Sequence, residues 1–497
     1  METKIYFRDL DCYINASDQM KAHKLMCPDR CFDLSRFPTA EISMEMKAFI
    51  YERGRKLTPL SIRSELFPFN QLGDFLSERY PDIKNFGEIK QTELEKKAKM
   101  WLLKNNKNIM QTRYRTATGK KEVTDAELIK YIRKIYSYVN ALNTFFLYEE
   151  DRWYLNGIPI KLRTNPTKEV SSISFEKIAQ DVLREEVKKI IYIHLSQKAL
   201  GTVTAEITAI NRFSKYLFKN YPDVESLQEI DRELLEQYLI YTNTEEIGRK
   251  SYCKELCHLK ELFITAGKVF ENKELEELFY RDDIGNTPSR LYKVYSDSEL
   301  KRLNAAITEG DEQIARALIL HQLLGTRISE TLTLKRNSVF KGKSGKLMLR
   351  ICQIKTGRIY EKAINEDVKK LFDKACDYTY QKHGKTEYVF VTDKEPEKPM
   401  QYGRIQYQLM AMITKYDLRD DKGERFGVGT HIWRHCYGKK LTEMHVDDIT
   451  IAKLMGHANT SSLQHYRRVG NEMLSDETRT MREAMDDMLD SIIKEWK

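Results

Sequence analysis

Two stretches of this chain carry the same residue pattern at a constant offset of 141, so the fold has to accommodate one local unit twice. FNQLGDFLSERYPDI at 69–83 is repeated as INRFSKYLFKNYPDV at 210–224, and each stretch follows a glutamate, Glu65 or Glu206. Proline and aspartate end helices. Each copy therefore predicts an amphipathic helix, a turn at Tyr-Pro-Asp and a second helix soon after the next isoleucine.

A further helix closes each copy. In the first copy it is TDAELIKYIRKIYSYVNALNTFFLY, beginning at Thr124 with a capping box to Glu127; in the second it runs from roughly Lys250 to Ala266. Residues 108–122, NIMQTRYRTATGKKE, are basic and polar and contain a glycine, which predicts a loop inserted into the first copy. Such a loop either lies on phosphates or is simply solvated, and both alternatives stay open.

Two segments have the composition of linkers, NPTKEVSS at 165–172 and DIGNTPSR at 283–290. They predict an N-terminal helical module at 1–170, a second at 171–288 and a larger domain at 289–475. A C-terminal helix follows at 476–497, and it either docks onto a neighbouring protomer or packs on its own domain. Its apolar side consists of Met481, Met485, Met488, Ile492 and Trp496.

Composition sets broad limits on the class of protein. The chain has 83 Lys and Arg against 74 Asp and Glu, a net charge of +9, which mildly favours a polyanionic partner. There is no apolar run of the ~18 residues that a membrane helix needs, and the opening METKIYFRDLDCY lacks the apolar stretch of a secretory signal. We therefore expect a cytoplasmic protein without membrane contact.

The eight cysteines are scattered, so we expect reduced thiols and not a disulfide framework. Two small groups contain cysteine and histidine but lack the paired C-x2-C spacing of structural zinc sites. We predict no metal at either. The groups are Cys12, His23, Cys27 and Cys31, and Cys253, Cys257 and His258.

The third domain carries charged residues at helix junctions and turns. Gly325 ends a predicted helix and the next begins near Arg327, where a guanidinium can reach an anion and Glu330 can support it. KLMLRICQIK and RIYEKAI alternate as strands around Thr356-Gly357, which predicts a two-residue hairpin turn with Lys355 at its lip. EYVFVT at 387–392 is expected to extend the same antiparallel sheet.

Further along stand His431-Ile-Trp-Arg434-His435, then Gly456-His457, and finally Tyr466. The order Arg, hairpin Lys, H-x-x-R, G-H and Tyr resembles the catalytic domain of the tyrosine recombinase (phage integrase) family. The spacings agree as well: the two histidines are 26 positions apart, and the tyrosine follows the second histidine by nine positions. The resemblance covers roughly residues 290–470.

The resemblance implies a fold for the whole chain. We expect a mainly α multidomain protein with two tandem helical core-binding (SAM-like) domains, followed by an α+β catalytic domain with a small antiparallel sheet. The usual family member has one core-binding domain. The duplication resembles the longer recombinases of bacterial integrative transposons, and we favour additional DNA over a protein partner for the extra copy.

The resemblance also implies a mechanism. Tyr466 attacks the scissile phosphate to form a 3'-phosphotyrosine, Arg327 and Arg434 clamp the non-bridging oxygens, and Lys355 protonates the 5'-oxygen. His431 assists as general base and His457 hydrogen-bonds the phosphate. No Walker loop is present.

We therefore expect no cofactor. The implied partners are specific sites on double-stranded DNA, a homo-tetramer on that DNA and accessory recombination proteins. The implied role is integration or excision of a mobile element, in a bacterial cytoplasm at the nucleoid.

Three other functions are compatible with parts of this pattern. One is a DNA-binding accessory protein that keeps the recombinase fold without catalysis, and another is a DNA-relaxing enzyme of the type IB topoisomerase class. The third is a metallohydrolase that uses His431 and His435, which are four residues apart on a predicted helix; the pair lacks the H-E-x-x-H pattern.

Overall fold

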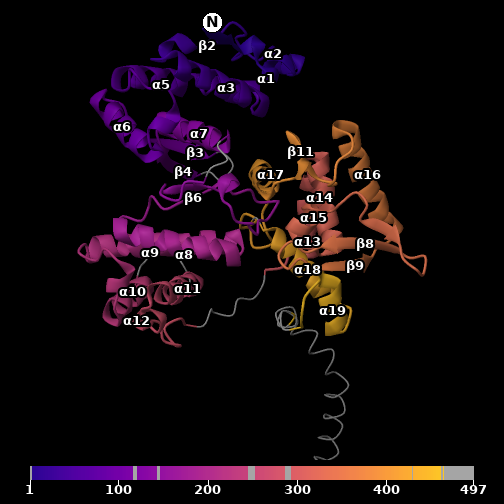
Figure 1. The fold of residues 1–497 in the computed structure, drawn as a ribbon. Helices are drawn as coiled ribbons and strands as arrows, with labels where there is room; N and C mark the ends of the chain where they lie inside the picture. Colours follow the sequence, from indigo (N-terminus) through magenta and orange to yellow (C-terminus); the bar gives the residue numbers. More distant parts are fainter. Residues whose placement is uncertain are drawn as a thin grey trace, which may run out of the picture. The chain divides into compact units, whose positions relative to one another are not determined.

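The computed structural model describes residues 3–115, 120–142, 146–244, 252–285, 293–427, 429–460 and 463. The chain forms two compact units. The first contains 1–163 and 170–284, and the second contains 164–169 and 285–497 (Figure 1). The described part is mainly helical, with small antiparallel sheets of two or three strands.

The described helices include none with the length and apolarity to cross a membrane. The division of the chain at 170 and 288 stays a prediction.

The first unit contains two hydrophobic cores. One is built from residues between Ile5 and Tyr136 and the other from residues between Trp153 and Phe279. The elements around the first core are β1 Lys4–Tyr6, α1 Asp11–Ile14, α2 Asp18–Lys21, β2 Cys31–Asp33, α3 Ala40–Lys56, α4 Pro59–Arg63, α5 Leu66–Arg79, η3 Phe86–Glu88, α6 Gln91–Lys104, β3 Met110–Arg115, β4 Lys120–Asp125 and α7 Glu127–Leu142. Those around the second are β5 Arg152–Tyr154, β6 Ser172–Ser174, α8 Asp181–Gln197, α9 Leu200–Asn220, η5 Leu227–Glu229, α10 Arg232–Thr244, α11 Cys253–Phe270 and α12 Lys273–Glu276.

The repeated sequence folds into a repeated local structure. Helix α5 ends at Tyr80 (φ −141°, ψ 60°) and α9 ends at Tyr221 (φ −139°, ψ 64°). Each tyrosine N–H donates to the carbonyl four residues back, on Leu76 or Leu217, over 2.7 Å. A short 3-10 helix and then the next α-helix follow in both copies. The local turn is therefore the same in both copies, as the sequence predicts; that both copies bind DNA stays a proposal.

The glutamate that precedes each copy is buried and paired with cations. Glu65 accepts from Arg53 and, over 2.9 Å, from Lys134. Glu206 accepts from His194 and from Lys198, both over 2.8 Å. Both glutamates expose 2% or less of their surface. Burial of a carboxylate is tolerated only with such partners, so these two positions constrain the packing of each copy.

Replacing Glu206 with alanine leaves His194 and Lys198 without their common acceptor. We expect Glu206→Ala to lower the free energy of unfolding by about 3 kcal/mol, the usual cost of removing one partner of a buried ion pair. Glu261→Ala is the matched control, because Glu261 also pairs with Lys198 but its side chain is 57% exposed. Urea unfolding followed by circular dichroism measures both; equal effects of the two changes would contradict the expectation.

The predicted loop at 108–122 is wrong, because the segment is a β-hairpin. Strands β3 and β4 pair antiparallel from Met110 opposite Asp125 to Arg115 opposite Lys120. The segment holds β-branched and aromatic residues that favour strands. The predicted capping box is also wrong, since Thr124 belongs to β4 and the helix begins at Glu127.

In the second unit, helices and two small sheets surround one large hydrophobic core. Its elements are α13 Asp297–Thr308, α14 Glu312–Leu324, α15 Ile328–Leu332, β7 Val339–Lys341, β8 Leu347–Cys352, β9 Ile359–Ala363, α16 Glu366–His383, β10 Val391–Thr392, β11 Glu395–Pro399, α17 Tyr402–Lys415, α18 Thr430–Glu443 and α19 Asp448–Met455. The order β7-β8-β9 makes the three-stranded antiparallel sheet.

Two details of this sheet differ from the prediction. Residues 387–392 do not extend it: Val391–Thr392 pairs with β11 instead, while the N–H of Val389 donates to Leu334 O. The β8-β9 turn is also longer than two residues, because Gln353 N–H donates to Arg358 O and leaves 354–357 in the turn. Gly357 takes the positive φ of 67° that this turn needs.

Residues 164–169 pack within the second unit although they follow the first unit in the chain. Tyr402 N–H donates to Thr167 O over 2.8 Å, and Glu169 N–H donates to Gln401 Oε1 over 3.0 Å. Lys398 lies 3.1 Å from the Glu169 carboxylate. Much of the segment predicted as a linker thus has fixed partners.

Candidate active site

Arg327 stands at the junction of α14 and α15. Gly325 ends α14 with a φ of 60°, and a side chain there would overlap the Tyr437 ring at 2.2 Å. The buried carboxylate of Glu330 accepts from Arg327 N–H over 2.9 Å and from its Nη1 over 2.7 Å. Glu330 therefore supports Arg327 as the sequence predicts, and it fixes one face of the guanidinium.

Among the predicted site residues that the structure describes, Arg434 is the most deeply buried, with 1% of its surface exposed. Its Nη1 donates to Gly325 O over 2.7 Å and its Nη2 donates to Met455 O over 2.6 Å. These carbonyls lie at the C-terminal ends of α14 and α19, where the helix dipole is negative. One side chain of α18 therefore joins the ends of two other helices.

His321 positions the start of α18, and sequence reasoning missed it. It is 1% exposed; its Nε2 lies 2.9 Å from Thr430 O and its Nδ1 lies 3.2 Å from Thr331 Oγ1. Burial lowers the pKa of His321 to about 4, so the ring is neutral and can make both contacts. The signal available was a histidine inside the apolar run ARALILHQLLG, which is usually structural.

His457 follows the C-terminal end of α19. Gly456 adopts a φ of 65°, and His457 N–H donates to Ala452 O over 2.8 Å. Burial, followed by the charges of Arg434 and Arg327, lowers the pKa of His457 to about 4. Its buried Nδ1 has no hydrogen-bond partner among the described residues. The ring is thus neutral and retains an unsatisfied polar atom.

His431 begins the H-x-x-R pattern on α18. Burial of the ring is the largest cause that lowers the pKa of His431, and the charges of Arg434 and Arg327 lower it further. The charges of Arg434 and Arg327 lower the pKa of both His431 and His457. Four of the six predicted site residues are therefore close enough to interact electrostatically.

Lys355 is exposed in the β8-β9 turn, and Gln353 ties this turn to the His457 segment. The amide nitrogen of Gln353, which is 3% exposed, donates to Gly456 O. Its amide oxygen accepts from the Thr356 hydroxyl over 2.7 Å. Gln353 is therefore a second residue that sequence reasoning missed; its burial beside a polar turn was not visible in the strand alternation.

Lys362 is a buried cation of β9 that sequence reasoning also missed. Its Nζ donates to Leu324 O and lies 4.0 Å from the centre of the Tyr437 ring. Burial, with the charge of Arg434 as a second cause, lowers the pKa of Lys362 to about 7. The residue thus contributes a donor to the same helix end that Arg434 holds through Gly325.

Tyr466 and the C-terminal helix predicted at 476–497 lie outside the described residues. Leu463 is described, and it is buried against Ile451, Ala452 and Met455 of α19.

The described residues offer no metal site. They contain no group of three His, Cys, Asp or Glu side chains placed to hold a metal ion. His431 and His435 do lie close together, with ring centres 5.0 Å apart. A third ligand, which a metallohydrolase needs, is missing beside them in this part of the chain.

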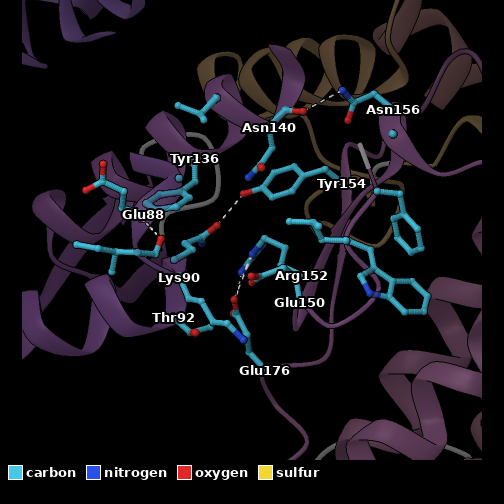
Figure 2. Close-up of a pocket in the computed structure, with 18 residues that line it drawn as sticks. Glu88, Lys90, Thr92, Tyr136, Asn140, Glu150, Arg152, Tyr154, Asn156 and Glu176 are labelled. Carbon is cyan, nitrogen blue, oxygen red and sulfur yellow. Dashed lines mark hydrogen bonds and ion pairs between the residues drawn. The ribbon is translucent and has the colours of Figure 1, made fainter. Parts of the chain in front are cut away.

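A separate cavity of about 390 Å³ lies in the first unit, between segment 87–92, α7 and the segment around β5 (Figure 2). Arg152 pairs with Glu176 over 2.8 Å, and Tyr154 donates to Gln91 over 2.7 Å. These polar groups bind one another, and none of the predicted site residues lines the cavity. We assign no chemistry to it.

Gly456 should be intolerant of a side chain. Its φ is positive, and a Cβ would come within 2.3 Å of the Gln353 amide. We expect Gly456→Ala to lower the free energy of unfolding by about 2–4 kcal/mol, from backbone strain and overpacking. Gly403→Ala in α17 is the control, since its Cβ would meet nothing within 4 Å. Thermal unfolding of both variants checks this, and an unchanged midpoint for Gly456→Ala would contradict it.

Lys362 should make stability depend on pH. Its folded pKa of about 7 lies below the ordinary 10.5, so between these values the unfolded chain binds a proton that the folded chain does not. Stability then rises with pH in that window, by up to about 1.4 kcal/mol per unit. Lys362→Met removes this slope. Urea unfolding at pH 7 and pH 9 measures it; the same change with pH in both proteins would refute the assignment.

Parts of the sequence match known proteins. Residues 293–473 match the model of the phage integrase family. The chain is 21% identical over 422 residues to transposase B from transposon Tn554 of Staphylococcus aureus strain N315, covering 84% of this chain and 67% of that protein. It is 23% identical over 294 residues to the tyrosine recombinase XerC of Lacticaseibacillus casei, covering 56% of this chain and 90% of that protein.

Among solved structures, the XerH site-specific recombinase bound to palindromic difH substrate is similar over 61% of this chain and 91% of that one. The sequence identity is 17% and the TM-score is 0.44. A TM-score below 0.5 does not establish a common arrangement of the whole chain. The relationship to the phage integrase family and to the proteins named above rests on the matches in sequence.

Proposed function

We propose that this chain, a tyrosine site-specific recombinase whose residues 293–473 form a phage integrase domain, cleaves and rejoins DNA through a 3'-phosphotyrosine formed by Tyr466. The observation that supports this most directly is the gathering of Arg327, Arg434 and two neutral histidines. Such a cluster suits one anionic group, and a backbone phosphate supplies it.

The described residues fit the roles that the chemistry requires. Arg327 and Arg434 neutralise charge on the non-bridging oxygens of the phosphate as it develops. The unsatisfied Nδ1 of His457 gains a partner if a phosphate oxygen enters the cluster. His431, with its pKa below the ordinary value, is unprotonated at neutral pH and can accept a proton.

The reaction then follows from these roles. The phenolic oxygen of Tyr466 forms a bond to phosphorus and passes its proton to His431. The bond to the 5'-oxygen breaks, and Lys355 donates the proton that this oxygen takes up. A 5'-hydroxyl reverses the step on a partner strand. One phosphodiester is exchanged for another, so no external energy source or cofactor is needed.

The wider function rests on the relatives. Tn554 transposase B is a transposon protein by its name, and the match to it covers most of this chain. We propose that the substrate is specific sites on double-stranded DNA and that the reaction serves integration or excision of a mobile element. A homo-tetramer on DNA, accessory recombination proteins, a core-binding role for both helical modules and a bacterial cytoplasmic, nucleoid location belong to the same proposal.

A suicide substrate with a nick beside the cleavage site tests the reaction. We expect the wild type to form a covalent protein-DNA band on a denaturing gel in the presence of chelator, and Tyr466→Phe to form none. Tyr437→Phe is the control, since it removes one phenolic hydroxyl and keeps the ring that packs against Lys362. A covalent band with Tyr466→Phe would disprove the role of Tyr466.

The same preparation separates the alternatives. Efficient relaxation of plasmids without a specific site would favour a DNA-relaxing enzyme. DNA binding without a covalent band in the wild type would favour an accessory protein.

A further inference from the structure

The part of the first unit that surrounds its first hydrophobic core carries an unusual run of positive charge. Residues 96–121 contain nine Lys and Arg and no Asp or Glu, although the whole chain has 74 acidic residues against 83 basic ones. The run covers the second half of α6, the loop after it and most of the β3-β4 hairpin. Such local excess of one sign favours a polyanionic partner over a protein surface of mixed charge.

One face of the hairpin is open to solvent. Antiparallel pairing puts Tyr114 opposite Lys121 and Thr112 opposite Val123, so these four side chains share a face. All four are exposed, with Tyr114 and Val123 each 61% exposed. The opposite face packs on α7, where Gln111 donates to Glu127 and Lys130 donates to Thr124.

A groove of about 560 Å³ runs beside this hairpin, between it, the start of α5 and the loop after α6. Amides, a hydroxyl and an ammonium group line most of its polar surface. The carboxylate of Glu127 also lines it; against the opposing effect of burial, hydrogen bonds from Gln111 and Lys130 hold its pKa below the ordinary value. The polar residues used here are Gln71, Asn106, Lys107, Asn108, Gln111 and Thr112.

We propose that this groove and the exposed face of the β3-β4 hairpin bind the backbone of double-stranded DNA. The cations meet phosphates, and the amides and hydroxyl donate to phosphate and sugar oxygens. Tyr114 and Val123 cover the apolar edges of the sugars. This inference rests on the proposed function, which supplies the DNA. It deepens that function, because it gives the part of the first unit around its first hydrophobic core a DNA contact of its own.

The test removes two exposed charges from this surface of the full chain. The variant is Lys107→Gln and Lys121→Gln. The matched control, Lys4→Gln and Lys24→Gln, removes two exposed charges elsewhere in the first unit. Equal thermal midpoints of both proteins establish that each folds.

Binding to a duplex of arbitrary sequence is measured over a range of salt concentrations. Each phosphate contact contributes about 0.9 to the slope of log affinity against log salt, so the slope of the hairpin variant should fall by about 2. The control variant should keep the wild-type slope. An unchanged slope in the hairpin variant overturns the proposal, including the case in which recombination is lost, since that result points to a protein partner.

The covalent band on the suicide substrate is recorded for the same proteins. If wild type forms no band, the proposed function fails whatever the salt slopes show. If wild type forms the band and the hairpin variant keeps the full salt slope, only the DNA contact of the hairpin fails.

Discussion

The buried guanidinium of Arg434 is the interaction on which the second unit depends most. Its side chain is 1% exposed, and it donates to the carbonyls of Gly325 and Met455 at the ends of α14 and α19. Both helices end in a glycine of positive φ, Gly325 or Gly456, where a side chain would collide with its surroundings. The three elements that bring Arg327, His431 and His457 together therefore meet at one side chain. A residue of the predicted site is thus also the residue that assembles the site.

This arrangement concentrates positive charge in a poorly solvated region. Arg327 has the carboxylate of Glu330 as partner, whereas Arg434 and Lys362 are held by carbonyl oxygens, which carry only partial charge. Burial disfavours protonation of Lys362 and His457, and the like charges beside them disfavour it further; the low pKa values of both residues express these two effects in that order. An anion that enters the cluster relieves the repulsion. Binding energy and electrostatic stabilisation of a phosphate then have the same source.

The sequence predicted the local structure wherever one residue type has one structural use. The Tyr-Pro-Asp turns and the glycine end of α14 follow from backbone rules, and the structure confirms both. It failed where the pairing of one strand with another decides. The hairpin at 110–125 looked like a loop because its polar residues obscured the alternation, and strand 391–392 pairs with a neighbour that only the packing reveals.

The same division holds for the candidate site. The residues of the family pattern could be named from their order and spacing. His321, Gln353 and Lys362 could not, because their roles are contacts to backbone oxygens 38 to 109 residues away, and no motif records such contacts. Positioning residues of this kind are visible only once the helix ends that they hold are placed.

The segment 164–169 changes how this protein can be divided into working fragments. Because it belongs to the second unit while both of its flanks belong to the first, no single cut in the polypeptide yields two intact units. A C-terminal fragment that starts at 285 leaves Tyr402 N–H and the Gln401 amide without the acceptors and donor that Pro166, Thr167 and Glu169 supply. An exchange of the second unit at the later boundary alone would therefore leave six of its residues behind.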